Sequence, residues 1–112
     1  MPDFISNLIQ DKKRYKQFLK DVNALPAPYA QTLMAIQKYL WNFARSGSII
    51  EPLEEILHLF QESAAENVPV QQIIGSDPVA FAEDIMVQYP EALWLIKYQN
   101  QLRQQVKEAE QL

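Results

Sequence analysis

The sequence contains no cysteine and only two glycines, Gly47 and Gly75. A disulfide framework and a cysteine-based zinc site are therefore excluded, and the lack of cysteine suits a reducing compartment. A glycine-rich phosphate-binding loop is excluded because it needs several glycines close together. No apolar run approaches the roughly 20 residues of a membrane-spanning helix, and no basic segment precedes the first apolar residues. We therefore expect a cytoplasmic protein without a membrane segment.

Histidine occurs once, at position 58, and the serines lie mostly in expected turns. No serine nucleophile therefore has a visible histidine base. Glu54 with Glu55 and Glu83 with Asp84 are adjacent acidic pairs, and neighbouring side chains on a helix diverge by about 100°, so neither pair favours a coupled acid/base dyad. We expect a protein that is not an enzyme and that needs no cofactor.

Lysine and arginine are absent from residues 46–96, which carry nine acidic residues. Residues 1–45 carry seven basic and three acidic residues, and residues 97–112 carry three and two. The basic residues that crowd the first expected helix are Lys12, Lys13, Arg14, Lys16 and Lys20. They could contact nucleic-acid phosphates, but the acidic middle would oppose a polyanion, and no recognition-helix pattern accompanies them. We favour pairing between this basic helix and the acidic middle of the same chain.

Hydrophobic residues make up 48% of the 112 residues, which is ample for one core, and we expect a single helical domain over 1–112. The expected helices cover about 3–25, 28–45, 51–67, 69–74 (short), 77–89 and 90–111. No alternating strand pattern occurs. The fold class is therefore all-α: a compact antiparallel array of about four to five helices.

Proline, glycine and aspartate mark where these helices begin and end. Pro26 ends the first helix, and Gly47 supplies the clearest break between the second and third. Asp77 suits the N-cap of the fifth helix, with a proline after it at the first helical position. Pro90 removes an internal hydrogen bond, so the last helix is expected to be long and kinked or broken near this residue.

The helix over 28–45 is expected to lie at the centre of the array. An apolar stripe runs along it through Tyr29, Leu33, Ile36, Leu40 and Phe43. A second apolar group lies beside the stripe and consists of Ala30, Met34 and Trp41. Because roughly half of the circumference is apolar, we expect several neighbouring helices, with Trp41 mostly buried and structural. The expected core is Leu33, Ile36, Leu40, Trp41, Phe43, Ile56, Leu57, Phe60 and Ile85.

The last helix carries two apolar stripes, whereas a peripheral helix needs one. The first stripe continues the buried face of the preceding helix. The second consists of Leu95, Tyr98, Leu102, Val106 and Ala109, and it extends past the point where the first becomes polar. It could fold back onto the first helix, or it could meet a second copy or a different protein. We predict the latter, a homodimer or a heteromeric contact through these five residues.

Three blocks of the sequence resemble a bacterial helical family, domain of unknown function 1048. The blocks are 36–41 (IQKYLW), 57–66 (LHLFQESAAE) and 75–84 (GSDPVAFAED). The chain departs from the family pattern at Ala82 and around Asn67. The resemblance implies no established activity. It also implies an association with PadR-type transcriptional repressors, beside which members are often encoded, and a label as DNA-binding ferritin-like proteins.

The ferritin-like label can be tested against the residues. Such di-iron sites use Glu-x-x-His motifs and carboxylates that point into the bundle. Glu55 and His58 match one motif, but the buried side of this helix is defined by Leu53, Ile56, Leu57, Phe60 and Ala64. His58 lies on the opposite side, together with Glu51, Glu55, Glu62 and Glu66. We therefore expect a solvated acidic face and no metal.

Two function classes remain. The first is an accessory or regulatory module that binds another protein. The alternative is a nucleic-acid-binding protein that uses the basic first helix.

Overall fold

The computed structural model describes the backbone of residues 2–42, 49–89 and 94–112, and the side chains of residues 9–42, 49–89 and 97–112. Over these residues the chain forms helices and no strand. The helices are α1 (Pro2–Asn23), α2 (Ala27–Trp41), α3 (Ile50–Ala65), α4 (Val70–Ile74), α5 (Pro78–Met86) and α6 (Trp94–Ala109). The predicted all-α class is confirmed.

The signals for helix ends act as expected where the structure describes them. Pro26 precedes α2 in an extended conformation, and Pro28 lies in the first turn of that helix. The carboxylate of Asp77 accepts a hydrogen bond of 3.0 Å from the backbone N–H of Val79, which confirms the predicted N-cap of α5. Gly47 and Pro90 lie outside the described residues, and so does the expected bend at Pro90.

The end of α3 has a feature that the sequence analysis did not anticipate. Asn67 adopts a positive φ of 59°, and its N–H donates to the carbonyl of Ala64. The next N–H, that of Val68, reaches back to the carbonyl of Ser63 at 2.8 Å. These two bonds form a Schellman motif, in which asparagine takes the left-handed position usually held by glycine. The motif ends α3 and directs the chain towards α4.

The core lies between α1, α2, α3 and α5. The buried apolar side chains are Phe18 and Val22 from α1, Leu33, Ile36 and Leu40 from α2, Ile50, Leu53, Ile56, Leu57 and Phe60 from α3, and Ala82 and Met86 from α5, with Ile49 just before α3. Both central helices contribute one face each, as the helical spacing of their apolar residues requires. Ile85 is half-buried at the edge of this core.

Ala30, one member of the second apolar group of α2, is half-buried against the core, but Trp41 is not buried as predicted. Trp41 is 44% exposed, and Met34 is also exposed. The prediction for Trp41 is wrong because its side of α2 is only partly covered by α1. The indole still contacts the ring of Tyr15 in an edge-to-face arrangement, with ring centroids 5.9 Å apart. Phe43, the remaining residue of the expected core on this helix, lies outside the described residues.

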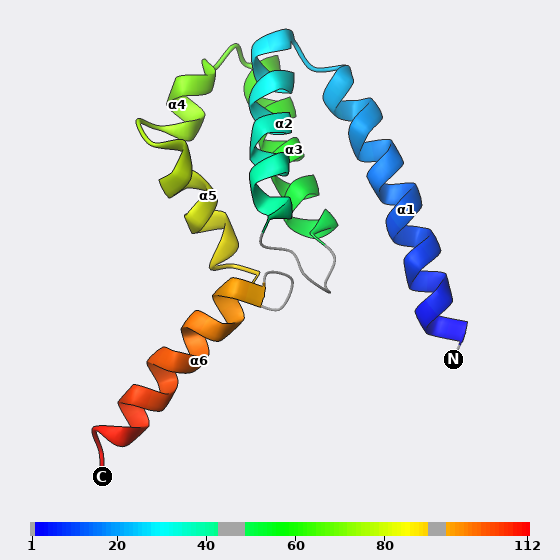
Figure 1. The fold of residues 1–112 in the computed structure, drawn as a ribbon. Helices are drawn as coiled ribbons and strands as arrows, with labels where there is room; N and C mark the ends of the chain where they lie inside the picture. Colours follow the sequence, from blue (N-terminus) through cyan, green and yellow to red (C-terminus); the bar gives the residue numbers. More distant parts are fainter. Residues whose placement is uncertain (1, 43–48, 90–93) are drawn as a thin grey trace.

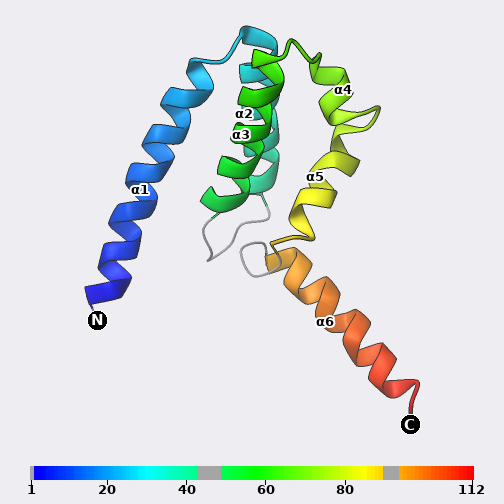
Figure 2. The same ribbon diagram turned by 180° about the vertical axis from the view of Figure 1, so that it is seen from behind.

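The helices form a flat, open arch rather than a fully compact array (Figure 1). α2 and α3 lie side by side in the middle, α1 packs against both on one side, and α4 and α5 pack against α2 on the other. The radius of gyration is 16.5 Å, whereas a compact domain of this length has about 13 Å. The excess arises because α6 projects away from the other helices, as both views show (Figure 2).

Candidate interaction surface

The apolar side of α6 carries three large apolar side chains that are exposed to solvent. Tyr98 is 56% exposed, Leu102 63% and Val106 49%. Ala109 is exposed as well, whereas the side chain of Leu95 lies outside the described residues. We call the described members of this surface, Tyr98, Leu102, Val106 and Ala109, the α6 stripe. The structure therefore leaves Leu102, Val106 and Ala109 of the α6 stripe accessible to solvent.

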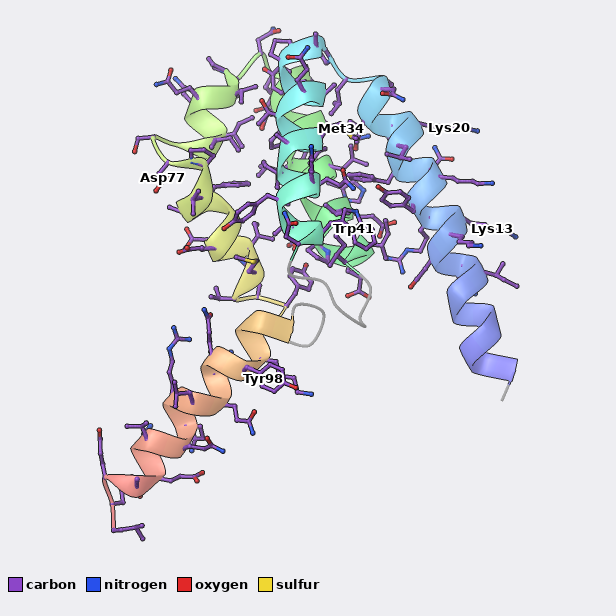
Figure 3. The ribbon with its side chains drawn as sticks, in the orientation of Figure 1. Lys13, Lys20, Met34, Trp41, Asp77 and Tyr98 are labelled. Atoms are coloured by element: carbon purple, nitrogen blue, oxygen red, sulfur yellow. The ribbon has the colours of Figure 1, made fainter. Side chains whose placement is uncertain are left out.

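The α6 stripe does not fold back onto the first helix. α1 and α6 lie on opposite sides of the central pair α2 and α3 (Figure 1). Tyr98 accordingly lies far from Lys13 and Lys20, which Figure 3 labels on α1. Every residue from 97 to 112 is exposed. The structure therefore does not contain the arrangement in which α6 folds back onto α1.

The lysines of α1 form a basic outer face. Lys12, Lys13, Lys16 and Lys20 are all exposed. Lys13, Lys16 and Lys20 lie on the side of α1 opposite Phe18 and Val22, and Lys12 lies at the border of this side. Figure 3 shows Lys13 and Lys20 pointing away from α2 and α3. We call these four residues the α1 lysine face, and this face is exposed to solvent.

Arg14 behaves differently from these lysines. Its Nε donates to Glu54 of α3 at 3.2 Å, and its second guanidinium nitrogen contacts the other carboxylate oxygen at 2.5 Å. This bidentate hydrogen bonding raises the pKa of Arg14 further above its usual value. The basic first helix thus pairs with the acidic middle through Arg14.

A family model described as "Protein of unknown function (DUF1048)" matches residues 6–107. The chain belongs to the DUF1048 family. A search of curated proteins finds no match. The matched range includes the core, the basic helix and the first three residues of the α6 stripe, so these features lie within the DUF1048 domain.

The acidic side of this DUF1048 protein follows α3. Glu51, Glu55, His58, Glu62 and Glu66 are all exposed, as their position opposite the buried face predicts. Glu55 accepts a hydrogen bond from the hydroxyl of Tyr89, which follows α5, and this bond raises the pKa of Tyr89 to about 12. Within the described parts of the chain, no three histidine or acidic side chains are grouped so that they could hold a metal ion. The ferritin-like label therefore finds no support in these residues.

A polar contact between α1 and α2 was missed by the sequence analysis. The amide of Gln37, which is 93% buried, donates a hydrogen bond of 2.7 Å to the hydroxyl of Tyr15. The ring of Tyr15 also stacks on Phe18, with centroids 6.0 Å apart. The sequence offered one signal for the burial of Gln37: this residue follows Ile36 on a helix with an unusually wide apolar arc.

Among the described helices, none is long and apolar enough to cross a membrane.

Proposed function

We propose that this DUF1048 protein is a cytoplasmic, non-enzymatic interaction module that binds another protein chain through the α6 stripe. The observation that carries the proposal is the exposure of Tyr98, Leu102 and Val106 on a helix that projects from the rest of the fold. Burying a large apolar side chain contributes about 1.5–3 kcal/mol, so three aligned side chains provide a substantial driving force for association.

The pattern along α6 also supports a role in binding. Steps of four residues separate Tyr98, Leu102 and Val106, and a step of three follows to Ala109. These steps keep all four side chains within one narrow stripe, and the remaining positions of the helix are mainly glutamine and charged residues. An amphipathic helix of this kind presents its apolar side to a partner helix or groove.

The family resemblance suggests one class of partner. Because members are often encoded beside PadR-type transcriptional repressors, a regulator of this type is a candidate for the protein that α6 contacts. The role would then be accessory: the DUF1048 protein would alter the regulator's assembly or stability.

Affinity purification from the native cell tests the proposal. The tagged wild-type chain is compared with Leu102→Glu combined with Val106→Glu, and with the matched control Asn100→Glu, which adds a charge on the opposite side of α6. We expect proteins that co-purify with the wild type and the control to be lost with the double variant. Equal recovery with all three chains would contradict the proposal.

A second candidate function is supported by the α1 lysine face. Its four exposed lysines are placed to contact a phosphate backbone, so binding of DNA or RNA through α1 is the alternative. A titration of duplex DNA at several salt concentrations separates the two functions. Phosphate-mediated binding must weaken steeply as salt rises and must fall in the variant Lys13→Gln with Lys16→Gln. Undetectable binding at low salt removes this alternative.

A further inference from the structure

We infer that one broad side of the arch, the side on which α2 lies, binds peripherally to the surface of an anionic lipid membrane. α2 lies in front of α3 in Figure 1, and α3 lies in front of α2 in the view from behind, so the two helices occupy opposite sides of the arch (Figure 2). The inference goes beyond the proposed function and does not depend on the α6 stripe. It is carried by exposed apolar side chains among lysines and by the opposite charge of the two sides.

Two large apolar side chains are exposed on α2. Met34 is 37% exposed and Trp41 is 44% exposed. They are seven residues apart, which is about two helical turns, so they lie almost in line along the helix. Figure 3 shows both on the side of α2 that is nearer to α1. They form a short apolar strip beside the junction of α1 and α2.

Three exposed lysines border this strip: Lys12 and Lys16 of α1, and Lys38 of α2. Lys38 follows Met34 by four residues and precedes Trp41 by three, so it lies on the same side of α2 as both. We call the five residues Lys12, Lys16, Met34, Lys38 and Trp41 the α2-side patch.

The positions of Lys12 and Lys16 follow from the contacts of their neighbours on α1. Arg14 reaches Glu54 of α3, whereas Tyr15 contacts α2. The turn of the helix from Arg14 to Tyr15 is therefore a turn from α3 towards α2. Lys12 and Lys16 lie about 60° and 100° beyond Tyr15 in the same rotational direction, at the surface beside α2.

The α2-side patch has no acidic side chain within it. α2 contains no aspartate or glutamate. Asp11 of α1 forms an ion pair with Arg14, at 3.9 Å, and Asp21 follows Arg14 by seven residues, so both lie towards the flank of α1 that carries Arg14 to α3. Glu83 and Asp84 belong to α5, which lies on the other side of α2 from α1, about one helix diameter or 10 Å away. At physiological salt this distance is enough to screen their charge from the lysines.

The opposite side of the arch is acidic. The exposed acidic residues of α3 are Glu51, Glu55, Glu62 and Glu66, and α3 contains no lysine or arginine. The fold is only 20 Å thick along its shortest axis. An anionic surface therefore attracts the α2 side and repels the α3 side, which fixes how the molecule approaches it.

The apolar strip favours a membrane over a nucleic acid as the anionic partner. At a bilayer surface, lysines contact anionic headgroups while apolar side chains enter the boundary between headgroups and acyl chains, where tryptophan is enriched. A phosphate backbone would instead place charged groups against Met34 and Trp41. Because a lysine near an anionic leaflet strengthens binding about fivefold, three lysines predict a preference of roughly a hundredfold for anionic over neutral vesicles.

Co-sedimentation of the full chain with lipid vesicles tests the inference. We expect binding to vesicles of equal parts phosphatidylglycerol and phosphatidylcholine, little binding to phosphatidylcholine alone, and weaker binding as salt rises. The triple variant Lys12→Gln, Lys16→Gln and Lys38→Gln should bind at least tenfold more weakly. The matched control Lys97→Gln, Arg103→Gln and Lys107→Gln removes the same charge from α6 and should bind like the wild type. A wild type that does not bind anionic vesicles, or equal losses in the two triple variants, overturns the inference.

Tryptophan fluorescence tests the apolar part of the contact. Trp94→Phe leaves Trp41 as the one tryptophan in the chain. Its emission should move to shorter wavelength when anionic vesicles are added, because the indole leaves water for the lipid boundary. An unchanged emission spectrum of protein that has bound to the vesicles contradicts the assigned surface.

Duplex DNA serves as the competing anion. A wild type that binds DNA but not anionic vesicles, with the loss confined to the variant of Lys12, Lys16 and Lys38, assigns the lysines to nucleic acid and overturns the membrane inference. Vesicle binding that persists when DNA is in excess supports it.

Discussion

The amide of Gln37 and the hydroxyl of Tyr15 join α2 to α1 through a hydrogen bond of 2.7 Å inside the core. Only 7% of Gln37 is exposed, so water cannot readily replace the tyrosine as the partner of the amide. Tyr15 also contacts Phe18 and Trp41 through its ring. One residue of α1 therefore carries both a polar and an aromatic contact to the centre of the fold.

Tyr15→Phe should destabilise the protein by about 1–3 kcal/mol, because it leaves the buried amide of Gln37 without its partner. Urea denaturation followed by circular dichroism measures the change. Combining Tyr15→Phe with Gln37→Leu should recover part of the loss, since both polar groups are then removed. A double variant that loses the sum of the two single effects would indicate that the hydrogen bond is unimportant.

Trp41→Ala should cost only about 1–2 kcal/mol, which is less than a buried tryptophan would cost, because the indole is half-exposed and meets the ring of Tyr15 in an edge-to-face contact. Its neighbour Leu40 is fully buried, and Leu40→Ala should cost about 2–5 kcal/mol. Comparison of the two variants by urea denaturation checks the ranking. Equal losses would mean that Trp41 contributes as a core residue after all.

The difference between Leu40 and Trp41 illustrates how far the sequence could predict the fold. Periodicity correctly placed Leu33, Ile36 and Leu40 on a buried face, because residues three or four positions apart lie on the same side of a helix. It could not show that Trp41 lies beyond the cover provided by α1, since coverage depends on how two helices cross. The same limit applies to Gln37, whose burial depends on a hydroxyl from another helix.

The candidate surface was predictable in part. The spacing of Tyr98, Leu102 and Val106 showed that these residues share a side of one helix, but it left open whether that side faces α1 or solvent. The projection of α6 away from the other helices resolved this point, and the spacing of residues along one helix does not encode where that helix lies relative to the others. Charge counts likewise suggested pairing between the first helix and the acidic middle, yet only the structure identifies Arg14 and Glu54 as the residues involved.

Asn67 provides a backbone prediction, because it holds a left-handed conformation with a φ of 59° at the end of α3. Asn67→Gly should maintain or slightly raise the melting temperature, since glycine adopts this conformation without steric cost. Asn67→Val should destabilise the protein by about 1–2 kcal/mol, because its branched side chain clashes with the backbone there. Thermal unfolding of the three proteins decides the matter, and a valine variant as stable as the wild type would contradict the assigned motif.

Tyr89 gives a pH-dependent prediction through its hydrogen bond to Glu55. The bond raises the pKa of Tyr89 to about 12, above the value of about 10 for an unfolded chain. The contribution of this hydrogen bond to the stability of the protein is therefore complete below pH 10, where the tyrosine keeps its proton in both the folded and the unfolded state. Between pH 10 and 12 the unfolded state loses this proton first, so the contribution declines as the pH rises through the folded pKa.

Tyr89→Phe should consequently be less stable than the wild type by about 1 kcal/mol at pH 8, a modest value because the contact is partly solvated. The gap between the two proteins should close as the pH approaches 12, the folded pKa of Tyr89. Lysine deprotonation over the same interval affects both proteins alike and cancels in the difference. Urea unfolding at pH 8, 10 and 11.5 measures the gap. A stability difference that stays constant across this pH range would show that the hydroxyl of Tyr89 does not donate a hydrogen bond to Glu55 in the folded protein.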